Sequence, residues 1–558
     1  MTRVPAIRVF QQPASRLALP RAGGAILLLT ALAACVPGSR PPGAGVPLVV
    51  IVIVDQLGSG MLEAIQPQLA GGFARFLDDG LRFPQCEHDH ASSVTGPGHA
   101  TLATGMHPSR HGIIWNEWHD RARRKDVSSP SAPQEDSTAN FDGSAAVTGG
   151  YMQGETLGDL LKRADPNSQV FAVSLKDRSA ALSAGRHADG VFWFNARSGG
   201  FTSNPALMPR LPGWGREFWE GDPFEMSFAG VRLPRAWAYP IRPGARPDDD
   251  PFESDALSRV SPHPIASARA LRASPWADWL TLMLARQIMA SGHLGADAHT
   301  DLLVIALSAT DYIGHEYGPG SQEHLDQLMR LDGWLEELME AADAAAAGGG
   351  GRAIFALASD HGVLPLPERV AGGRRIDEGD LERRLRAAAV RALGEGDWIQ
   401  AIVGPHLYLD HGKLEQAGIS IAAAARRVRD EIARLADVAR VYDAADLATQ
   451  VPGDEHQRLQ RNAWRPDRGG DLVIQECELC LLTDDPTGTS HGTVYAYDRR
   501  VPLIIMGERI AAGESAQPCR TVDLAPTLAA VLALPRFESP RDGRALTLRG
   551  VDTPDQPK

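Results

Sequence analysis

Four short apolar runs constrain the fold of this chain more than any other feature of its sequence. They are rich in β-branched residues and carry no alternating polar side chains, which is typical of strands buried on both faces of a parallel sheet. Segments with helical periodicity lie between them, at 279–290 and 322–346. The sequence therefore predicts an α/β fold around a mostly parallel central sheet. The four runs are 46–54, 302–307, 353–358 and 501–506.

Acidic and imidazole side chains follow three of the four runs. Asp55 ends the first run, Asp311 lies shortly after the second, and Asp360 and His361 follow the third. Ligands of open α/β sheets bind beyond the carboxyl ends of the strands, so we expect these side chains to gather at one edge. His315 lies four positions after Asp311 and shares its face if a helical turn follows the strand.

His491 lies in a loop of small residues, 488–492, that leads into the fourth run. With the residues above it makes a set of three aspartates and three histidines without a thiolate. Such a set suits Zn²⁺ in a catalytic site, with Mn²⁺ or Fe²⁺ as alternatives. Any one of these residues is more simply interpreted as a surface aspartate or a hydrogen-bonded core histidine, but their joint placement favours a metal centre.

Thr95 is the candidate nucleophile. Hydroxyl residues, glycines and Pro97 precede a helix-like run here, which is a helix N-terminal pattern with Thr95 at or near the N-cap. Backbone N–H groups and the helix dipole favour an anion at this place, so a phosphoryl group on Thr95 would be stabilised. A free threonine hydroxyl is a weak nucleophile, but a divalent metal promotes its ionisation. Taken alone, the pattern fits a plain helix cap better.

The first 34 residues predict a secretory signal. Four arginines and no acidic residue precede an apolar run at 25–32, which is shorter than the roughly 20 residues of a membrane span. The run leads into Leu-Ala-Ala-Cys at 32–35, which resembles a bacterial lipobox. We therefore expect a signal peptide over 1–34, a lipid-modified Cys35 and a Pro/Gly-rich tether over 35–47. This predicts a place in the periplasm or cell envelope, with the outer membrane favoured; an ordinary cleaved signal is the alternative.

Four cysteines remain beyond Cys35, an even number that suits up to two disulfides in an oxidising compartment. Cys477 and Cys480 have the Cys-x-x-Cys spacing of a redox or zinc site, but no second such pair and no thioredoxin-like pattern accompanies them. A structural disulfide is therefore favoured. The three connectivities with Cys86 and Cys519 stay open.

Two stretches interrupt the series of strands. Residues 196–275, rich in Pro, Trp and Gly, lack clear periodicity and are expected to form an irregular insertion over the site. Residues 365–488 contain a helix-like segment at 419–436 and a strand-like segment at 398–409. They predict a small α/β subdomain packed on the main sheet.

From about residue 46 to 535 the chain resembles the alkaline phosphatase superfamily, in its section of threonine-nucleophile nucleotide pyrophosphatases and phosphodiesterases. The resemblance rests on the order and approximate spacing of seven residues and on the segments 95–99 and 112–116. It implies an alkaline-phosphatase-like three-layer sandwich over 48–535, with inserted subdomains over the site and a tail over 536–558. The seven residues are Asp55, Thr95, Asp311, His315, Asp360, His361 and His491.

The resemblance also implies roles for these residues. Two Zn²⁺ ions would each be held by a group of three residues, with the nucleophile oxygen of Thr95 beside the second ion. Asn116 corresponds to the asparagine that binds a phosphoryl oxygen in the family. The groups are Asp311, His315 and His491 for one ion, and Asp55, Asp360 and His361 for the other.

Lys176 and Arg178 bear on the substrate class. They follow a strand-like segment at 170–175, and side chains two apart on an extended segment face the same side. The pair is similar to the Lys-x-Arg pair of phosphate-irrepressible, PafA-type alkaline phosphatases, which implies binding of a monoester dianion. Two cations also favour a dianion over a diester monoanion, because a charge-assisted contact is worth about 1.5 to 3 kcal/mol. A solvated basic strand end is the alternative.

The sequence therefore predicts an alkaline phosphatase, a metal-dependent hydrolase of small phosphate monoesters that acts through a phosphothreonine intermediate. A phosphodiesterase or nucleotide pyrophosphatase on the same fold, and a non-catalytic lipoprotein with a vestigial site, are the alternatives. The net charge of −13 argues against extended electrostatic binding of nucleic acid phosphates. We expect a monomer with membrane contact through lipidated Cys35, and the physiological substrate stays open.

Overall fold

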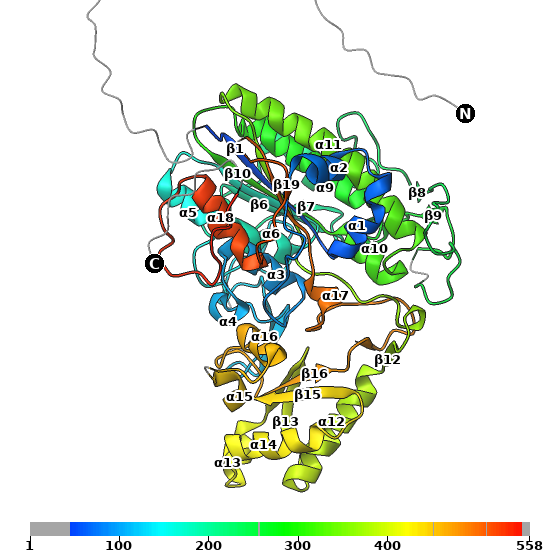
Figure 1. Ribbon diagram of the computed structural model, residues 1–558, viewed down its shortest axis with the longest axis vertical. Helices are drawn as coiled ribbons and strands as arrows, with labels where there is room; N and C mark the ends of the chain where they lie inside the picture. Colours follow the sequence, from blue (N-terminus) through cyan, green and yellow to red (C-terminus); the bar gives the residue numbers. More distant parts are fainter. Residues whose placement is uncertain (1–44, 135, 255–256, 450, 509, 549–558) are drawn as a thin grey trace, which may run out of the picture. The chain divides into compact units, whose positions relative to one another are not determined.

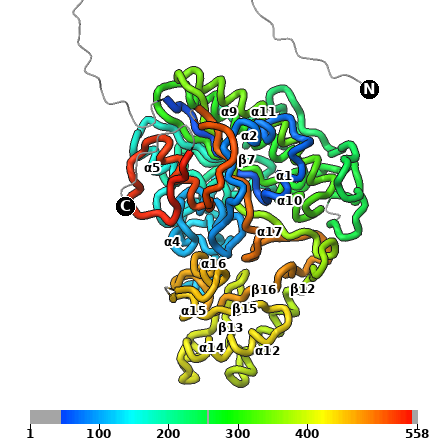
Figure 2. Tube along the Cα trace, viewed as in Figure 1, coloured from blue at the N-terminus to red at the C-terminus, as the bar shows by residue number. Residues whose placement is uncertain are grey.

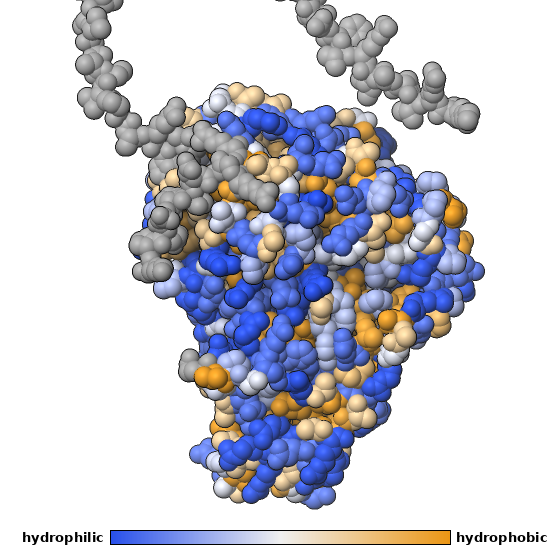
Figure 3. All heavy atoms as spheres, viewed as in Figure 1, coloured by the Kyte–Doolittle hydropathy of each residue, from blue (hydrophilic) through white to orange (hydrophobic). Residues whose placement is uncertain are grey.

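The computed structural model describes residues 45–134, 136–254, 257–449, 451–508 and 510–548. The predicted signal peptide, Cys35 and the tether up to residue 44 lie outside these residues, as does the predicted tail from residue 549. No helix in the described part of the chain has both the length and the apolar character that a membrane crossing requires. The face drawn in Figure 3 is mostly hydrophilic, and its hydrophobic side chains lie in separate patches.

A nine-stranded sheet forms the centre of the fold, in the order β19-β2-β18-β11-β1-β10-β5-β6-β7 (Figure 1). Its middle strands run parallel, and every residue of β1 is buried. The predicted α/β class and mostly parallel sheet are confirmed. The parallel strands are β11 (Ile354–Ala358), β1 (Leu48–Val54), β10 (Asp301–Leu307), β5 (Val170–Ser174) and β6 (Gly190–Asn195).

The fourth predicted strand departs from the parallel prediction. β18 (Leu503–Met506) runs antiparallel both to β11 and to β2 (Leu81–Arg82). Because it pairs antiparallel with β11, this strand starts at the edge where β11 ends and runs back. β7 (Gly200–Thr202) is also antiparallel to its neighbour β6, whereas β19 (Gly513–Glu514) runs parallel to β2.

Helices cover both faces of the central sheet (Figure 1). Side chains of β1 alternate between two apolar cores, with Val50 and Val52 in one and Val49 and Ile51 in the other. The sheet is therefore the middle of three layers. The first core includes α2 (Gly72–Asp79), α9 (Pro275–Gly292) and α11 (Gln322–Gly348), and the second includes α3 (Thr95–Thr104), α5 (Leu157–Ala164), α6 (Asp177–Ala184) and α18 (Leu524–Val531).

A four-stranded antiparallel sheet with packed helices forms within residues 365–488. Figure 2 shows the chain passing through these yellow elements and returning in orange to the central sheet. The strand predicted at 398–409 is instead a hairpin, because the chain turns at Gly404 with a φ of +55°. The elements are α12 (Glu378–Leu393), β13 (Ile399–Val403), β14 (His406–Leu409), α14 (Ile421–Ile432), β15 (Val438–Asp443) and β16 (Leu472–Glu476).

Residues 196–275 form short elements joined by irregular segments. Phe201, Phe218 and Trp237 are buried in the same apolar core as α9 and α11, so the segment packs on that face of the sheet. Its elements after β7 are α7 (Arg216–Trp219), β8 (Ala236–Trp237), β9 (His263–Pro264) and α8 (Ala268–Arg272).

The other elements are short, and two of them, α10 and α16, are nine-residue helices, of which α10 begins just after β10. β3 pairs with β4 and β12 with β17. They are α1 (Ser59–Ile65), α4 (Pro108–His111), β3 (Glu117–Asp120), β4 (Lys125–Ser128), α10 (Ala309–Tyr317), β12 (Arg374–Ile376), α13 (His411–Gln416), α15 (Ala444–Ala448), α16 (Glu455–Ala463), β17 (Cys480–Leu482) and α17 (Ala496–Arg499).

The cysteines form one disulfide and one close thiol pair. Cys477 and Cys480 are bonded to each other, so this Cys-x-x-Cys segment is a disulfide and offers no thiolate to zinc. Cys86 and Cys519 are free and buried, and their Sγ atoms lie 2.6 Å apart. Of the three connectivities left open by the sequence, this arrangement is compatible with the one that joins Cys86 to Cys519.

Candidate active site

The carboxyl ends of three neighbouring parallel strands position the candidate site residues. Asp55 directly follows β1, and Asp360 and His361 follow β11 after a single serine. Asp311 lies in the first turn of α10, just beyond β10. Because β11, β1 and β10 are adjacent and parallel, their carboxyl ends meet at one edge of the sheet. The three carboxylates and the imidazole are buried there.

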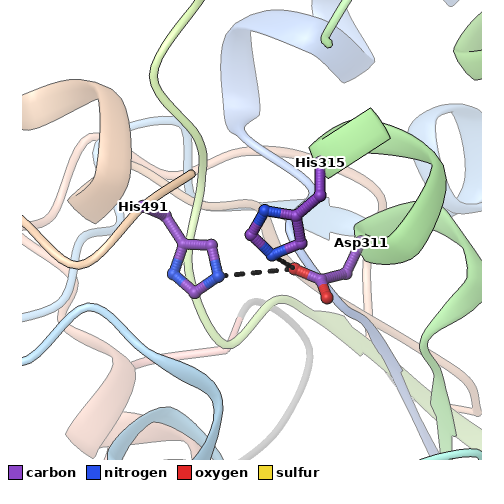
Figure 4. A group of neighbouring side chains, drawn as sticks. All are labelled: Asp311, His315 and His491. Carbon is purple, nitrogen blue, oxygen red and sulfur yellow. Dashed lines mark ion pairs between the residues drawn. The ribbon is translucent and has the colours of Figure 1, made fainter. Parts of the chain in front are cut away.

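Asp311, His315 and His491 form the first group of possible metal ligands. Asp311 and His315 lie on successive turns of α10, and His491 comes from the loop before α17 and β18. The Nε2 atoms of His315 and His491 lie 3.1 and 3.4 Å from the same Oδ1 atom of Asp311 (Figure 4). Ligand atoms of the three residues lie within 4.8 Å of one another, a spacing that suits donors around one ion.

Hydrogen bonds to main-chain carbonyl groups fix how the histidines present their rings. In each of three site histidines Nδ1 lies against a carbonyl oxygen, so the proton belongs on Nδ1 and the Nε2 lone pair faces the carboxylates. This is the arrangement that a metal-binding imidazole needs. The pairs are His315 with Thr489 at 2.8 Å, His491 with Ser93 at 2.9 Å and His361 with Gly362 at 3.0 Å.

A second group lies around Asp55. The Nε2 atom of His361 lies 3.4 Å from Oδ1 of Asp55 and 3.5 Å from Oδ2 of Asp360. The Oγ1 atom of Thr95 is 3.5 Å from the same Nε2 atom. His99, which the sequence reasoning did not single out as a ligand, also lies here, with Nε2 3.4 Å from Oδ2 of Asp360. Its presence in the segment 95–99 was the available signal.

The charges of this second group fit a divalent cation. Asp55 and Asp360 are fully buried. Oδ1 of Asp55 and Oδ2 of Asp360 accept no hydrogen bond from the described residues. Burial raises the pKa of Asp360 to about 7, and burial with the neighbouring carboxylates raises the pKa of Asp55 well above its ordinary value. A bound cation stabilises the ionised form of a buried carboxylate, so the oxygen atoms of Asp55 and Asp360 suit a metal ion.

The first group differs in its charge balance. Burial alone would raise the pKa of Asp311, but His315 and Lys176 outweigh burial and hold this pKa well below its usual range. Burial lowers the pKa of His491, which keeps its imidazole neutral and able to bind a metal.

Thr95 is the first residue of α3, and the residue before it, Val94, is the N-cap. The side-chain oxygen of Asn116 accepts a hydrogen bond of 2.8 Å from the backbone N–H of Gly96. The Nδ2 atom of Asn116 is thereby left to donate elsewhere. Gly98 allows α3 to approach the metal-binding edge, because a Cβ atom there would lie 2.3 Å from the carbonyl oxygen of Asp360.

Lys176 reaches the centre of the site from the end of β5. Its Nζ atom lies 2.6 Å from carboxylate oxygens of both Asp55 and Asp311, and 3.3 Å from Oγ1 of Thr95. Burial disfavours the ammonium, but the two carboxylates outweigh burial and raise the pKa of Lys176, so it stays charged. Lys176 therefore links the nucleophile to both ligand groups.

The extended segment predicted for Lys176 and Arg178 is wrong. β5 ends at Ser174, Lys176 is the N-cap of α6, and Arg178 lies in the first turn of this helix. The pair is still close to the site, because Asp55 and Asp311 act electrostatically on both side chains. Arg178 forms no ion pair with the described residues, and its buried Nε atom has no hydrogen-bond partner there. Its guanidinium is free to bind an anion.

Gln56 is a positioning residue that the sequence reasoning missed. Its Nε2 atom donates a 2.8 Å hydrogen bond to Asp311, and its backbone N–H donates one of 3.2 Å to Asp360. Its φ of +69° is unusual for a residue other than glycine and aims the side chain at the carboxylates. Gly314 leaves the space, because a Cβ there would lie 1.8 Å from Oε1 of Gln56.

Two further buried carboxylates, which the sequence reasoning also missed, hold the segments that carry His315 and His491. Asp278 on α9 accepts a 3.0 Å hydrogen bond from the backbone N–H of Ala309, where α10 begins. Asp498 on α17 accepts backbone hydrogen bonds of 3.0 and 2.7 Å from Gly492 and Thr493, directly after His491. Nothing in the sequence around Asp278 or Asp498 indicates these long-range contacts.

A model of the family described as type I phosphodiesterase / nucleotide pyrophosphatase matches residues 49–493. The chain belongs to this family. The chain is similar to alkaline phosphatase PafA of Elizabethkingia meningoseptica. The two are 28% identical over 524 residues, which cover 90% of this chain and 94% of that protein. Alkaline phosphatase PhoK of Sphingomonas sp. is 29% identical over 535 residues, covering 90% of this chain and 91% of that protein.

The fold of the chain is also similar to that of a solved structure. The crystal structure of wild-type alkaline phosphatase PafA matches it with a TM-score of 0.82 and 26% identity, over 91% of this chain and 99% of that chain. The resemblance to the alkaline phosphatase superfamily and the predicted fold are therefore confirmed.

Proposed function

We propose that the chain is an alkaline phosphatase, a metal-dependent phosphate monoester hydrolase that acts through a phosphothreonine intermediate. The contact that carries the proposal joins a buried hydroxyl to a buried cation, with Nζ of Lys176 3.3 Å from Oγ1 of Thr95. Arg178 adds a second cation with free donors. A monoester dianion has one more charged oxygen than a diester, and two cations match it. Similarity to the alkaline phosphatases PafA and PhoK supports the same assignment.

In this proposal Oγ1 of Thr95 attacks phosphorus in line with the leaving oxygen. The new Oγ1–phosphorus bond forms as the ester bond breaks, and the leaving alcohol takes a proton. Asn116, Lys176 and Arg178 hold the non-bridging oxygens and orient the phosphoryl group at the start of α3, where the helix dipole favours negative charge. Water then attacks the phosphothreonine, which releases phosphate and restores the hydroxyl.

Two divalent ions, which we propose to be Zn²⁺, fit the two ligand groups. When bound, they would supply Lewis-acid stabilisation of the attacking and leaving oxygens and favour ionisation of the attacking hydroxyl or water. The carbonyl contacts of the histidine Nδ1 atoms keep the Nε2 lone pairs directed at the ions. The ligands proposed are Asp311, His315 and His491 for one ion, and Asp55, Asp360 and His361 for the other.

A phosphodiesterase or nucleotide pyrophosphatase is the second candidate, because the matched family carries that description. A diester monoanion would leave one of the two cations without a charged oxygen. Lys176 already pairs with Asp55 and Asp311, but Arg178 forms no ion pair with the described residues. A half-buried cation without an anionic partner is costly, so the position of Arg178 favours the monoester.

We also propose that the mature protein is a monomer in the periplasm or cell envelope, attached through lipidated Cys35, with the outer membrane favoured. The arginines and the apolar run before the Leu-Ala-Ala-Cys segment at 32–35 support this proposal. The net charge of −13 supports small phosphate monoesters rather than nucleic acid as the partners.

The test compares kcat/KM for 4-nitrophenyl phosphate and bis(4-nitrophenyl) phosphate with the zinc-loaded protein. We expect a strong preference for the monoester, loss of activity with a chelator, and recovery when Zn²⁺ is restored. A preference for the diester would overturn the substrate class, and activity that survives complete removal of metal would overturn the metal assignment.

A further inference from the structure

A cavity of about 330 Å³ adjoins the candidate active site. One wall is formed by Trp115, next to Asn116, and by residues 490–493, which include His491. The opposite wall comes from α12 and the four-stranded sheet, with Leu381 and Ile474 among its apolar residues. Its volume is at the lower end of the roughly 300 to 1,000 Å³ of small-molecule sites. His491 belongs both to this lining and to the first group of possible metal ligands, so the cavity lies next to the edge where a phosphoryl group would bind.

The lining of the cavity is acidic. Among the described residues that form it there are four carboxylates and no lysine or arginine. Its one imidazole, on His491, faces the carboxylate of Asp311. A negatively charged group would meet repulsion here, and a neutral group would gain nothing from the charges. The carboxylates belong to Glu378, Glu382, Asp437 and Glu476.

Two of the four carboxylates are already paired. Asp437 forms ion pairs with Arg374 and Arg384, and Glu382 pairs with Arg386. These arginines lie outside the lining of the cavity. The structure therefore compensates half of the acidic charge with its own cations.

Glu378 and Glu476 form no ion pair with the described residues. Glu476 is half-buried at the end of β16, and burial raises its pKa to about 7. Glu378, at the exposed start of α12, lies among further carboxylates, and partial burial of its carboxyl group together with Asp484 and Asp485 raises its pKa. Both carboxylates lack the positive partner that would favour their ionised forms.

Trp115 supplies an aromatic surface between the carboxylates and the metal-binding edge. The hairpin turn at Gly404 packs on its indole, and a Cβ at this glycine would lie 2.4 Å from Nε1 of Trp115. An indole face attracts organic cations, and the attraction grows when the cation is desolvated. Aromatic, apolar and unpaired acidic groups are thus combined in one small cavity.

We propose that this cavity binds the leaving group of the substrate and selects a positively charged one. The substrate class is phosphate monoesters of amino alcohols, in which an ammonium or quaternary ammonium group is joined to the phosphate by a short chain. This inference rests on the proposed function, because the phosphoryl group has to lie between Thr95 and Lys176 for its alcohol to enter the cavity. Leaving groups with a second phosphate or a carboxylate are disfavoured.

The test compares choline phosphate with 3,3-dimethylbutyl phosphate, a neutral analogue of the same shape, on the zinc-loaded enzyme. We expect kcat/KM to be about tenfold higher for choline phosphate. Glu476→Gln should reduce this ratio about fivefold while leaving the neutral ester within about twofold. The matched control is Glu478→Gln, an exposed residue of the same segment that does not line the cavity, and it should leave the ratio unchanged.

Two results separate this inference from the proposed function. If both esters are cleaved with equal kcat/KM, or if Glu476→Gln leaves the ratio unchanged, the cationic site is wrong while the phosphatase assignment stands. If neither ester nor 4-nitrophenyl phosphate is cleaved, the proposed function itself fails.

Glu378→Gln at the exposed start of α12 provides a second variant if Glu476→Gln does not fold. Calorimetric titration of the holoenzyme with choline and with 3,3-dimethylbutanol checks the cation preference without turnover, and equal affinities would contradict it.

Discussion

Asp278 accepts a hydrogen bond of 3.0 Å from the backbone N–H of Ala309, the first residue of the helix that carries Asp311 and His315. Its other carboxylate oxygen accepts one of 2.7 Å from Gln327. Asp278 is fully buried on α9, and burial raises its pKa to about 7. The side chain thus fixes the start of α10 from outside the ligand set.

Asp278→Ala should loosen α10 and weaken metal binding. It leaves a buried N–H group without an acceptor, which costs about 1 to 3 kcal/mol of the free energy of unfolding. Asp278→Asn keeps the acceptor and should retain most of the stability and metal affinity. Urea unfolding and competition with a chromogenic chelator measure the two effects. Equal metal affinity in the alanine variant and the wild type would contradict a positioning role.

Replacement of Thr95 should change activity without changing the fold. Thr95→Ala removes the attacking oxygen and should abolish turnover, whereas Thr95→Ser keeps a hydroxyl at the start of α3 and should retain measurable activity. Circular dichroism and bound zinc should be unchanged in both variants. Mass spectrometry of acid-quenched wild-type enzyme should find the phosphoryl group on Thr95. Turnover by the alanine variant would remove Thr95 as the nucleophile.

Loss of Lys176 or Arg178 should lower kcat/KM more for a doubly charged substrate than for a singly charged one. Each substitution by alanine removes a charge-assisted contact worth about 1.5 to 3 kcal/mol, which corresponds to a roughly 10- to 150-fold fall in monoester kcat/KM. Hydrolysis of a diester should fall much less, because its phosphoryl group has one charged oxygen fewer. Arg197→Ala, at an exposed position, serves as the control. Parallel losses for both substrates, at equal zinc content, would count against the monoester assignment.

His406 should make the protein less stable in acid. It is buried on β14, and burial lowers its pKa from 6.5 to about 3. The unfolded chain binds the proton more tightly, so this contribution to stability is complete above about pH 6.5 and is lost as the pH falls toward 3.

His406→Asn removes this titration and keeps an acceptor near the backbone N–H of Gly470, which lies 3.4 Å from Nδ1 of His406. Between about pH 7.5 and pH 5, the wild type should lose about 2 kcal/mol of unfolding free energy relative to the variant. Urea unfolding at the two pH values measures the difference. If both proteins lose stability in parallel, the buried His406 does not control this acid sensitivity.

Much of the fold follows from local patterns in the sequence. The run at 48–54 is apolar at every position because β1 is covered by helices on both faces and has parallel neighbours on both sides. Its alternate side chains enter two separate cores, so no polar residue is tolerated. The direction of β18 could not be derived in this way, because an apolar strand has the same composition whichever way it runs. The hairpin at Gly404 had a local signal that was not used, because Gly404 is followed by Pro405 and a Gly-Pro pair is typical of a turn.

The antiparallel direction of β18 also explains where His491 lies. The loop before an antiparallel strand lies at the same sheet edge as the carboxyl ends of the parallel strands. His491 therefore reaches Asp311, although it precedes its strand while Asp311 follows one. The sequence located both residues near strand ends, but their meeting depends on how distant strands pair.

The sequence by itself determined the α/β class, the strands whose ends carry chemistry, and which aspartates, histidines and hydroxyl residues are candidates for the site. The class and the strands are local features, because they depend on residue type and spacing along single segments. The candidate residues follow from their places after those strands and from their order along the chain. The tertiary structure alone decided that Lys176 lies between Thr95 and two carboxylates, that Asp278 and Asp498 hold the histidine segments, and that unpaired carboxylates line a cavity beside His491. Each of these joins residues far apart in the chain, and their distances and pKa values are set by burial and by neighbours that only the folded chain brings together.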